Sequence, residues 1–247
     1  MIDKILLFPY WLSLKLRHFL YDTGLKKVRS ADVPTICIGN ITVGGTGKTP
    51  HTEMLIRTLL QDEDWGEKNI AVLSRGYKRK TKGFQQVTAD GSAIAYGDEP
   101  LQIKKKFPGI TVAVDGNRIE GCDFLAHPEK LQSSKKAKKC IDKDLPASDL
   151  IILDDAFQHR ALKPTLSIVL VDYNRPIFKD HLLPLGRLRD LPQRIAAADI
   201  VIVSKCPNEV NSWEKCTWAE NLGIRNFDAT SCSGTRSEEH TSELQSH

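Results

Sequence analysis

The stretch that decides the fold runs Thr35-Ile-Cys-Ile-Gly-Asn-Ile-Thr-Val-Gly-Gly-Thr-Gly-Lys-Thr-Pro50. A short β-favouring run is followed by a glycine-rich turn, and a segment compatible with a helix continues to Leu60. Because glycine lacks a Cβ atom, successive backbone N–H groups of such a turn can point inward around phosphate oxygens, and the next helix adds its positive end. The pattern predicts a phosphate-binding P-loop, with Thr42 in the place of the usual first glycine.

The P-loop pattern assigns roles to the residues at its end. We expect Lys48 to reach the β- and γ-phosphates of a nucleotide and the Thr49 hydroxyl to hold Mg²⁺. The alternative is an ordinary glycine-rich turn followed by an accidental Lys-Thr pair. The predicted nucleotide-binding residues of this segment are Val43, Gly44, Gly45, Thr46, Gly47, Lys48 and Thr49.

A P-loop needs an acidic partner at the end of a neighbouring strand, where a carboxylate orders the magnesium shell. The run Leu150-Ile-Ile-Leu-Asp154-Asp155 supplies two adjacent acids after four aliphatic residues. Such a pair is costly unless a cation or hydrogen bonds satisfy it, since neighbouring like charges raise each other's pKa. We therefore predict Asp154 and Asp155 as metal residues; the alternative for Asp155 is a helix cap.

Six short apolar runs alternate with helix-compatible stretches beyond residue 33. Continuous apolarity indicates strands covered on both faces, and helical crossovers make such strands parallel. The sequence therefore predicts an α/β fold, a doubly wound and mostly parallel sheet with ligands beyond the carboxyl ends of the strands. The predicted strands are Thr35–Ile38, Ile70–Leu73, Thr111–Val114, Leu150–Leu153, Ser167–Val171 and Asp199–Val203.

Composition excludes several classes of protein. The 247 residues are 40% apolar and 27% charged, which is typical of a globular chain and not of a disordered or multi-span membrane protein. The net charge of +4 suits an anionic ligand or a membrane surface, but it is too small for a nucleic-acid footprint, so we expect no nucleic-acid partner. The six cysteines are widely spread and predict neither a disulfide scaffold nor a zinc site, as in a reducing, cytosolic environment.

Residues 1–30 are both apolar and basic, and we predict a membrane-associating helix there. If Pro9 opens the helix, two apolar stripes form on roughly opposite sides, one for the protein and one for lipid. The alternative is a helix buried on both sides within the core. The stripes are Leu12, Leu16, Phe19 and Leu20 on one side, and Tyr10, Trp11, Leu14 and Tyr21 on the other.

The remaining chain divides by composition. We expect a P-loop core over residues 31–205 and the start of an incomplete second, C-terminal subdomain over residues 206–235. Residues 236–247 have one large apolar residue and no periodicity, and the string resembles translated sequencing-adapter sequence. We expect this non-native-looking tail to take no part in the fold.

Five further motifs follow the P-loop stretch in order, and together they resemble the tetraacyldisaccharide 4'-kinase family, the lipid A kinases of Gram-negative bacteria. They are Ser74-Arg-Gly-Tyr77, Gly97-Asp-Glu-Pro100, Asp154-Asp-Ala-Phe-Gln-His159, Leu183-Pro-Leu-Gly-Arg-Leu-Arg189 and Ser204-Lys-Cys-Pro207. The resemblance implies transfer of the γ-phosphate of ATP, with Mg²⁺, to the 4'-hydroxyl of a tetraacyldisaccharide 1-phosphate. It further implies a monomeric, peripheral enzyme on the cytoplasmic face of the inner membrane.

The resemblance also implies roles for individual residues. Asp98 is similar to the family's proposed base, and Glu99 lies beside it near the metal; a carboxylate there accepts or orients the proton of the sugar hydroxyl. The remaining implied site residues are Arg118 and Arg189, which match family arginines near the active site, and Gln158 and His159, which follow the acid pair. Alternatives are a helix start with Asp98 as N-cap, and a solvated surface position for Arg118. The family usually has Glu where Asp190 stands.

Two further hypotheses remain from the sequence. The family continues beyond the last motif found here, including an Asp-His-His segment with no counterpart in this chain, so we expect MgATP binding with phosphoryl transfer impaired or lost. A GTPase-like switch is a rival, because Ile200-Val-Ile-Val-Ser-Lys205 resembles the strand before a guanine-reading motif, although Pro207 stands where that motif needs Asp. A membrane-surface adaptor that keeps the loop as a relic is the third alternative.

Overall fold

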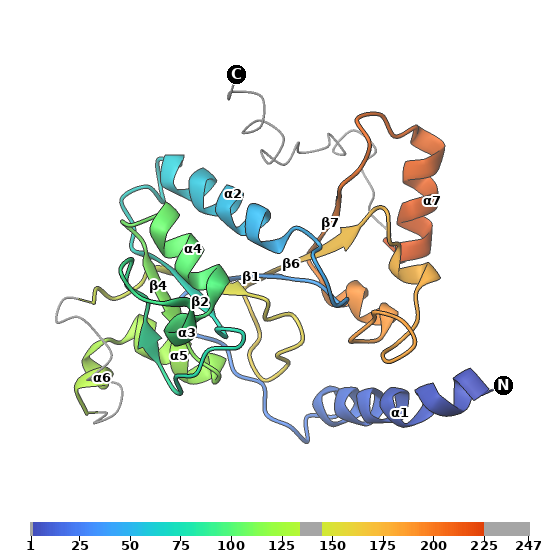
Figure 1. Cartoon of the computed structure of the whole chain (residues 1–247), viewed down its shortest axis with the longest axis horizontal. Helices are drawn as coiled ribbons and strands as arrows, with labels where there is room; N and C mark the ends of the chain where they lie inside the picture. Colours follow the sequence, from blue (N-terminus) through green and yellow to red (C-terminus); the bar gives the residue numbers. More distant parts are fainter. Residues whose placement is uncertain (1, 134–144, 225–247) are drawn as a thin grey trace.

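A single mostly parallel sheet organises the molecule (Figure 1). The structure, a computed structural model, describes residues 2–133 and 145–224, with side chains described from Leu7 onward. Within these residues the strands are β1 (Thr35–Gly39), β2 (Ile70–Ser74), β3 (Gln85–Gln86), β4 (Thr111–Val114), β5 (Leu150–Asp154), β6 (Leu166–Asp172) and β7 (Ile200–Ser204). Their order is β3-β4-β2-β5-β1-β6-β7, and every pairing is parallel except that of β3 with β4.

The six predicted strands are confirmed, each to within one residue at either end. The sequence did not predict β3, because its two glutamines carry no apolar pattern and become a strand only by pairing with the edge of β4. P-loop strand β1 lies between β5 and β6, with Ile38 opposite Asp154. The acid pair therefore stands at the strand end next to the loop, as expected.

Helices cover both faces of the sheet, which confirms the doubly wound fold (Figure 1). On one face, α2 (Lys48–Gln61) and α4 (Asp98–Lys106) pack on an apolar cluster that includes Ile70 and Val72 of β2. On the other, α5 (Arg118–Ala126) and α6 (Glu129–Ser133) pack on a cluster that includes Ala71 and Leu73. Alternate residues of one strand thus belong to opposite layers, as the two-residue period of a strand requires.

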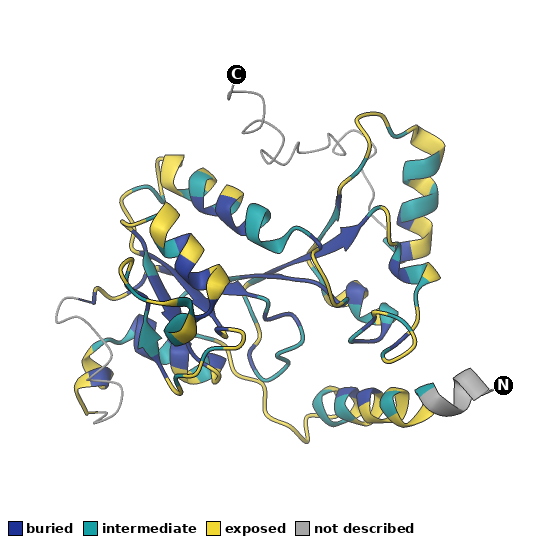
Figure 2. Ribbon diagram, in the orientation of Figure 1, coloured by how far each residue is buried: buried dark blue, intermediate teal, exposed yellow. Residues whose placement is uncertain are grey.

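Helix α1 (Ile2–Asp22) precedes the sheet, and its opening differs from the prediction. Pro9 does not open the helix but lies inside it. A proline there removes one backbone hydrogen bond, while Leu7 and Tyr10 on either side of it pack against the core and stabilise the continuous helix. Leu12, Leu16 and Phe19 are exposed, so the alternative of a helix buried on both sides is wrong (Figure 2). Trp11, predicted on the opposite stripe with Leu14, is also exposed, whereas Leu14 is buried, so the prediction for Trp11 is wrong.

The other described helices are α3 (Ala93–Tyr96), α7 (Ser212–Leu222) and the 3-10 turns η2 (Ile177–Lys179) and η3 (Pro192–Ala197). Ala219 and Leu222 of α7 are buried, and Leu222 belongs to the core cluster on the α5 side. The division at residue 206 stays a prediction, and the tail at 236–247 lies outside the described residues. Among the helices the structure describes, none is long and apolar enough to cross a bilayer.

Candidate nucleotide site

The glycine-rich loop joins β1 to α2 at the centre of the sheet. Gly44 and Gly47 have φ angles of 110° and 82°, in the left-handed region that residues with a Cβ atom rarely adopt. Gly47 is the N-cap of α2 and no side chain caps that end, so the first N–H groups of the helix are left for a ligand. The loop therefore has the backbone conformation that the P-loop reading requires.

Bonds from outside hold the loop in this shape. Asn40 Nδ2 donates to Thr46 Oγ1 at 2.6 Å, and Ser204 Oγ donates to the Thr46 carbonyl at 2.9 Å. Lys205 Nζ, at the end of β7, donates to the Gly45 carbonyl at 2.6 Å. Two amides of the loop also have partners, since the Val43 N–H donates to the Arg187 carbonyl at 2.8 Å and the Thr46 N–H to the Gly44 carbonyl at 3.1 Å, so the glycine amides are the ones that point to an anion. Thr46, predicted to bind phosphate, also serves as an internal support of the loop.

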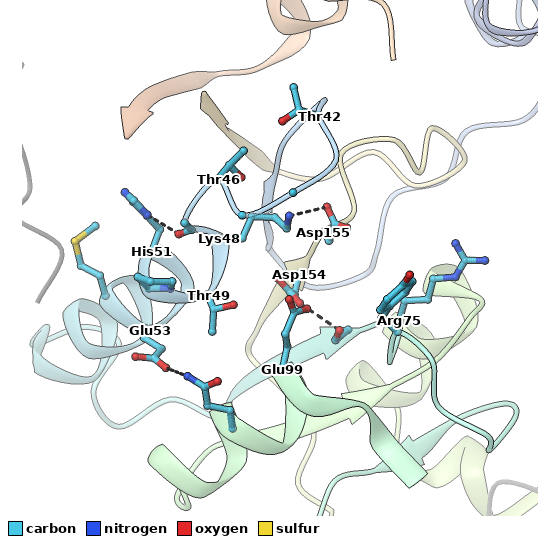
Figure 3. A pocket seen from close by; sticks show the side chains of 18 of the residues that line it. Thr42, Thr46, Lys48, Thr49, His51, Glu53, Arg75, Glu99, Asp154 and Asp155 are labelled. Atoms are coloured by element: carbon cyan, nitrogen blue, oxygen red, sulfur yellow. Dashed lines mark hydrogen bonds and ion pairs between the residues drawn. The ribbon is translucent and has the colours of Figure 1, made fainter. Parts of the chain in front are cut away.

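Asp154 ends β5 beside the loop and is 3% exposed. Ser74 Oγ, at the end of the neighbouring β2, donates to its Oδ2 at 3.2 Å (Figure 3). Burial, followed by the negative charges of Glu99 and Asp155, raises the pKa of Asp154 to about 6. A buried acid that faces two other acids indicates a site built to receive a cation.

Asp155 has a positive φ of 48° and does not cap a helix, so the cap alternative is wrong. Its carboxylate faces two cations: Lys48 Nζ lies 3.8 Å from Oδ1, and Arg189 binds both oxygens, with Nη1 3.0 Å from Oδ2. Burial alone raises the pKa of Asp155, but the hydrogen bonds and charge of Arg189, together with Lys48, hold it below its usual value. The two adjacent acids therefore differ: the pKa of Asp155 lies below its usual value, whereas that of Asp154 is raised to about 6.

A cavity of about 1990 Å³ opens above the carboxyl ends of the strands. It is lined by every predicted site residue except Asp98, including Val43, Glu99, Gln158 and His159. Figure 3 shows the side chains of Lys48, Thr49, Glu99, Asp154 and Asp155 converging on it. Residues from five separate stretches of sequence thus meet in one place.

Asp98 lies differently. Gly97 is the N-cap and Asp98 the first residue of α4, so the prediction of Asp98 as the cap is wrong, although the helix start is confirmed. Asp98 lines a smaller adjoining cavity, which shares Gln102 and Lys106 with the large one. The difference arises because successive residues in a helical turn point about 100° apart, so Asp98 and Glu99 cannot both face the same cavity squarely.

Arg118 is 3% exposed, so the alternative of a solvated surface arginine is wrong. Its Nη1 donates to the Asp115 carbonyl at 2.8 Å and its Nη2 to the Asp154 carbonyl at 3.0 Å. Burial lowers the pKa of His159, and the positive charges of Arg118, Arg17 and Arg75 lower it further. Both side chains line the large cavity.

Several residues of the cavity wall were not assigned to the site from the sequence, among them Arg17, Ser74 and Lys205. Ser74 and Lys205 lie in quoted motifs, but nothing in the motifs assigned them a role. Arg17 comes from α1 and donates to the backbone carbonyl of Gln158. Its only sequence signal is a basic residue on the polar stripe of an amphipathic helix, which is too common to be selective.

The residues present fit a nucleotide with Mg²⁺. The acids and the Thr49 hydroxyl supply the hard oxygen donors that Mg²⁺ prefers, and the raised pKa of Asp154 marks a carboxyl short of positive charge. Thr49, Asp154, Asp155 and Glu99 would hold the ion, and Lys48 with the loop amides would hold the phosphates.

Comparison with known proteins gives the family. Residues 4–246 match the model of the tetraacyldisaccharide-1-P 4'-kinase family. The tetraacyldisaccharide 4'-kinase of Phocaeicola vulgatus is 49% identical over 201 residues, covering 81% of this chain and 50% of that protein. That of Porphyromonas gingivalis is 46% identical over 201 residues, covering 81% of this chain and 51% of that protein.

A solved structure agrees with the fold. The crystal structure of LpxK from Aquifex aeolicus in complex with ATP matches with a TM-score of 0.68 and 33% identity, covering 83% of this chain and 59% of that one. The chain spans about half the length of the curated relatives it matches. A P-loop at the centre of the sheet, an acid pair beside it and this similarity lead to one conclusion: the chain belongs to the tetraacyldisaccharide-1-P 4'-kinase family.

Proposed function

We propose that this chain carries the ATP-binding half of a kinase that transfers the γ-phosphate of ATP to the 4'-hydroxyl of a tetraacyldisaccharide 1-phosphate in lipid A biosynthesis. The observation that carries the proposal is the convergence of Lys48, Asp154 and Asp155 on one cavity beside the loop. Family membership and the names of the relatives support the reaction. A GTPase-like switch has no such support, since the matched relatives are named as kinases.

The loop amides and Lys48 would bind the phosphates, and the carboxylates with Thr49 would hold Mg²⁺. Bound Mg²⁺ would neutralise charge on the β- and γ-phosphate oxygens. Arg189 binds Asp155 and lines the cavity, where a guanidinium offsets negative charge as the phosphoryl group moves. These residues perform binding and electrostatic stabilisation, which are the main requirements of phosphoryl transfer.

Asp98 and Glu99 are the first two residues of α4. We infer that Asp98 accepts the proton of the sugar hydroxyl, with Glu99 between it and the metal. The support is the position of Asp98 in the small cavity that adjoins the ATP cavity at Gln102 and Lys106. An acceptor hydroxyl that enters through the small cavity would meet Asp98 first.

The test is a transfer assay with radiolabelled ATP and the disaccharide lipid. It compares this chain, a form extended to the length of the relatives, and each form with Asp98→Ala or with the exposed control Asp90→Ala. We expect faster transfer in the extended form, loss of transfer with Asp98→Ala, and no change with Asp90→Ala. Equal rates with and without the Asp98 carboxylate would remove it as the base.

We further propose that α1 binds a lipid surface, the cytoplasmic face of the inner membrane. Its outer face exposes Phe8, Trp11, Leu12, Leu16 and Phe19, at 56%, 39%, 48%, 57% and 57% of their surface. Lys15 lies between them, over the Trp11 ring. An exposed apolar stripe with adjacent basic residues is typical of helices that lie in a membrane interface.

Vesicle flotation tests the lipid contact. Leu12→Ser, Leu16→Ser and Phe19→Ser together should abolish flotation with vesicles that contain anionic lipid. The matched control carries Ile94→Ser and Trp213→Ser, which remove apolar side chains that are 62% and 77% exposed elsewhere. Flotation that survives the first set of changes, or fails equally with the second, would contradict the assignment of α1.

A further inference from the structure

The inner face of α1 is bonded to the segment that carries Arg189. Tyr10 Oη donates to the Arg189 carbonyl at 2.9 Å, across 179 positions of sequence. About two helical turns further along α1, His18 Nε2 lies 2.6 Å from Asp190 Oδ1. This pair is buried, since His18 is 6% exposed and Asp190 is 1% exposed. Two successive residues of the segment are therefore each held by a different side chain of the same helix.

The partners of His18 fix its protonation pattern. Arg160 Nη1 lies 3.0 Å from His18 Nδ1, and a guanidinium can only donate. Nδ1 is therefore the acceptor, and Nε2 carries the hydrogen that is donated to Asp190. Asp190 Oδ1 also accepts from the Leu191 amide at 2.8 Å, while its Oδ2 is buried and has no partner within the described part of the chain. His18 is thus the principal side-chain partner of a buried carboxylate.

The segment held in this way positions a group of the site. The Arg189 amide donates to the Ile41 carbonyl at 2.9 Å, which joins the segment to the start of the glycine-rich loop. The Arg189 guanidinium then extends to Asp155 and to Asn40. Its two-point geometry at the carboxylate tolerates little displacement of the backbone.

We propose that α1 is a positioning element of the nucleotide site, in which Tyr10 and His18 act through the backbone of Arg189 and through Asp190 to hold the Arg189 guanidinium at Asp155. One face of the helix is exposed and apolar, and the opposite face fixes a cation beside the metal residues. The expected effect of α1 on ATP binding rests on the proposed function, whereas its expected effect on the backbone of residues 188–191 does not.

Backbone amide hydrogen exchange without nucleotide tests the positioning itself. Tyr10→Phe removes one oxygen atom, and His18→Gln keeps a donor near the position of Nε2. The control Tyr21→Phe changes the same helix and keeps the ring that faces Arg160. We expect Tyr10→Phe to speed exchange at residues 188–191 by about fivefold to tenfold, the factor that corresponds to one lost hydrogen bond, His18→Gln by less, and Tyr21→Phe not at all. Unchanged exchange there in Tyr10→Phe would overturn the proposal, whatever the chain does with ATP.

Calorimetric titration with ATP tests the consequence. Tyr10→Phe should weaken binding of ATP about fivefold in the presence of Mg²⁺, again about the factor of one hydrogen bond, and weaken it less in EDTA, because the Arg189 guanidinium binds Asp155, a proposed metal residue. Equal weakening with and without Mg²⁺ would show a general loosening and refute the specific role. A wild-type chain that binds no nucleotide would refute the proposed function, while the exchange experiment still decides the role of α1.

Discussion

Replacement of Lys48 by alanine is the sharpest test of the nucleotide site. The Lys48 side chain is 14% exposed, its Nζ lies 3.8 Å from Asp155 Oδ1, and it lines the cavity at the end of the glycine-rich loop. A hydrogen bond between charged groups contributes about 1.5–3 kcal/mol, so its loss should weaken nucleotide binding by about ten- to 150-fold. The change leaves the sheet and the glycines untouched.

Thermal unfolding measures this loss. At an ATP concentration of 100 times the wild-type Kd, binding stabilises the fold by about 2.7 kcal/mol, and a 30-fold weaker variant at the same concentration gains only about 0.9 kcal/mol. For a chain of this size, these values correspond to Tm shifts of about 5–10 °C and 2–4 °C. Lys68→Ala, an exposed lysine outside the cavity, is the control and should shift like the wild type.

The refuting result is an ATP-induced Tm shift in Lys48→Ala equal to that of the wild type. It would mean that the ammonium does not contact the phosphates and that the glycine-rich loop is only a turn. A GTP-specific shift in the wild type would instead revive the switch hypothesis, because the ligand that stabilises the fold is the one that binds it.

Three further outcomes are expected. Asp155→Ala should abolish the gain in ATP affinity that Mg²⁺ gives, in calorimetric titrations, without weakening binding in EDTA; an intact Mg²⁺ effect would exclude Asp155 as a metal residue. Gly39→Ala should cost about 1–3 kcal/mol in urea unfolding, because the new Cβ would lie 2.6 Å from Phe157 Cβ and 3.1 Å from its backbone nitrogen; equal stability would refute the contact. Without Mg²⁺, the free energy of unfolding should fall by up to about 3 kcal/mol as the pH rises from 4 through 6. The reason is that the pKa of Asp154 is about 6 in the folded state and 3.8 ordinarily, so folding favours the neutral form of this carboxyl group. Asp154→Asn should remove this slope, and a slope that persists in that variant would assign it to another group.

The sequence alone predicted the sheet, the glycine-rich loop and the acid pair. Continuous apolar runs located six strands to within one residue, because strands covered on both faces leave an unbroken apolar signal. The loop and the acid pair were equally readable, since a P-loop needs glycines and a Lys-Thr pair at short spacing, and the acids directly follow a strand. These features depend on the conformation and chemistry of neighbouring residues, and neighbouring residues can be read directly from the sequence.

Tertiary structure alone decided the rest. Side chains from distant segments decide whether Arg118 is buried, which cavity Asp98 faces and which residue pairs with Asp190. His18 and Asp190, for example, are 172 positions apart in the sequence. An arginine on a helix reads the same from sequence whether it faces water or, like Arg17, a ligand cavity. The physical reason is that hydrogen bonds and burial are properties of pairs of residues, and pairs between distant segments exist only once the layers have packed.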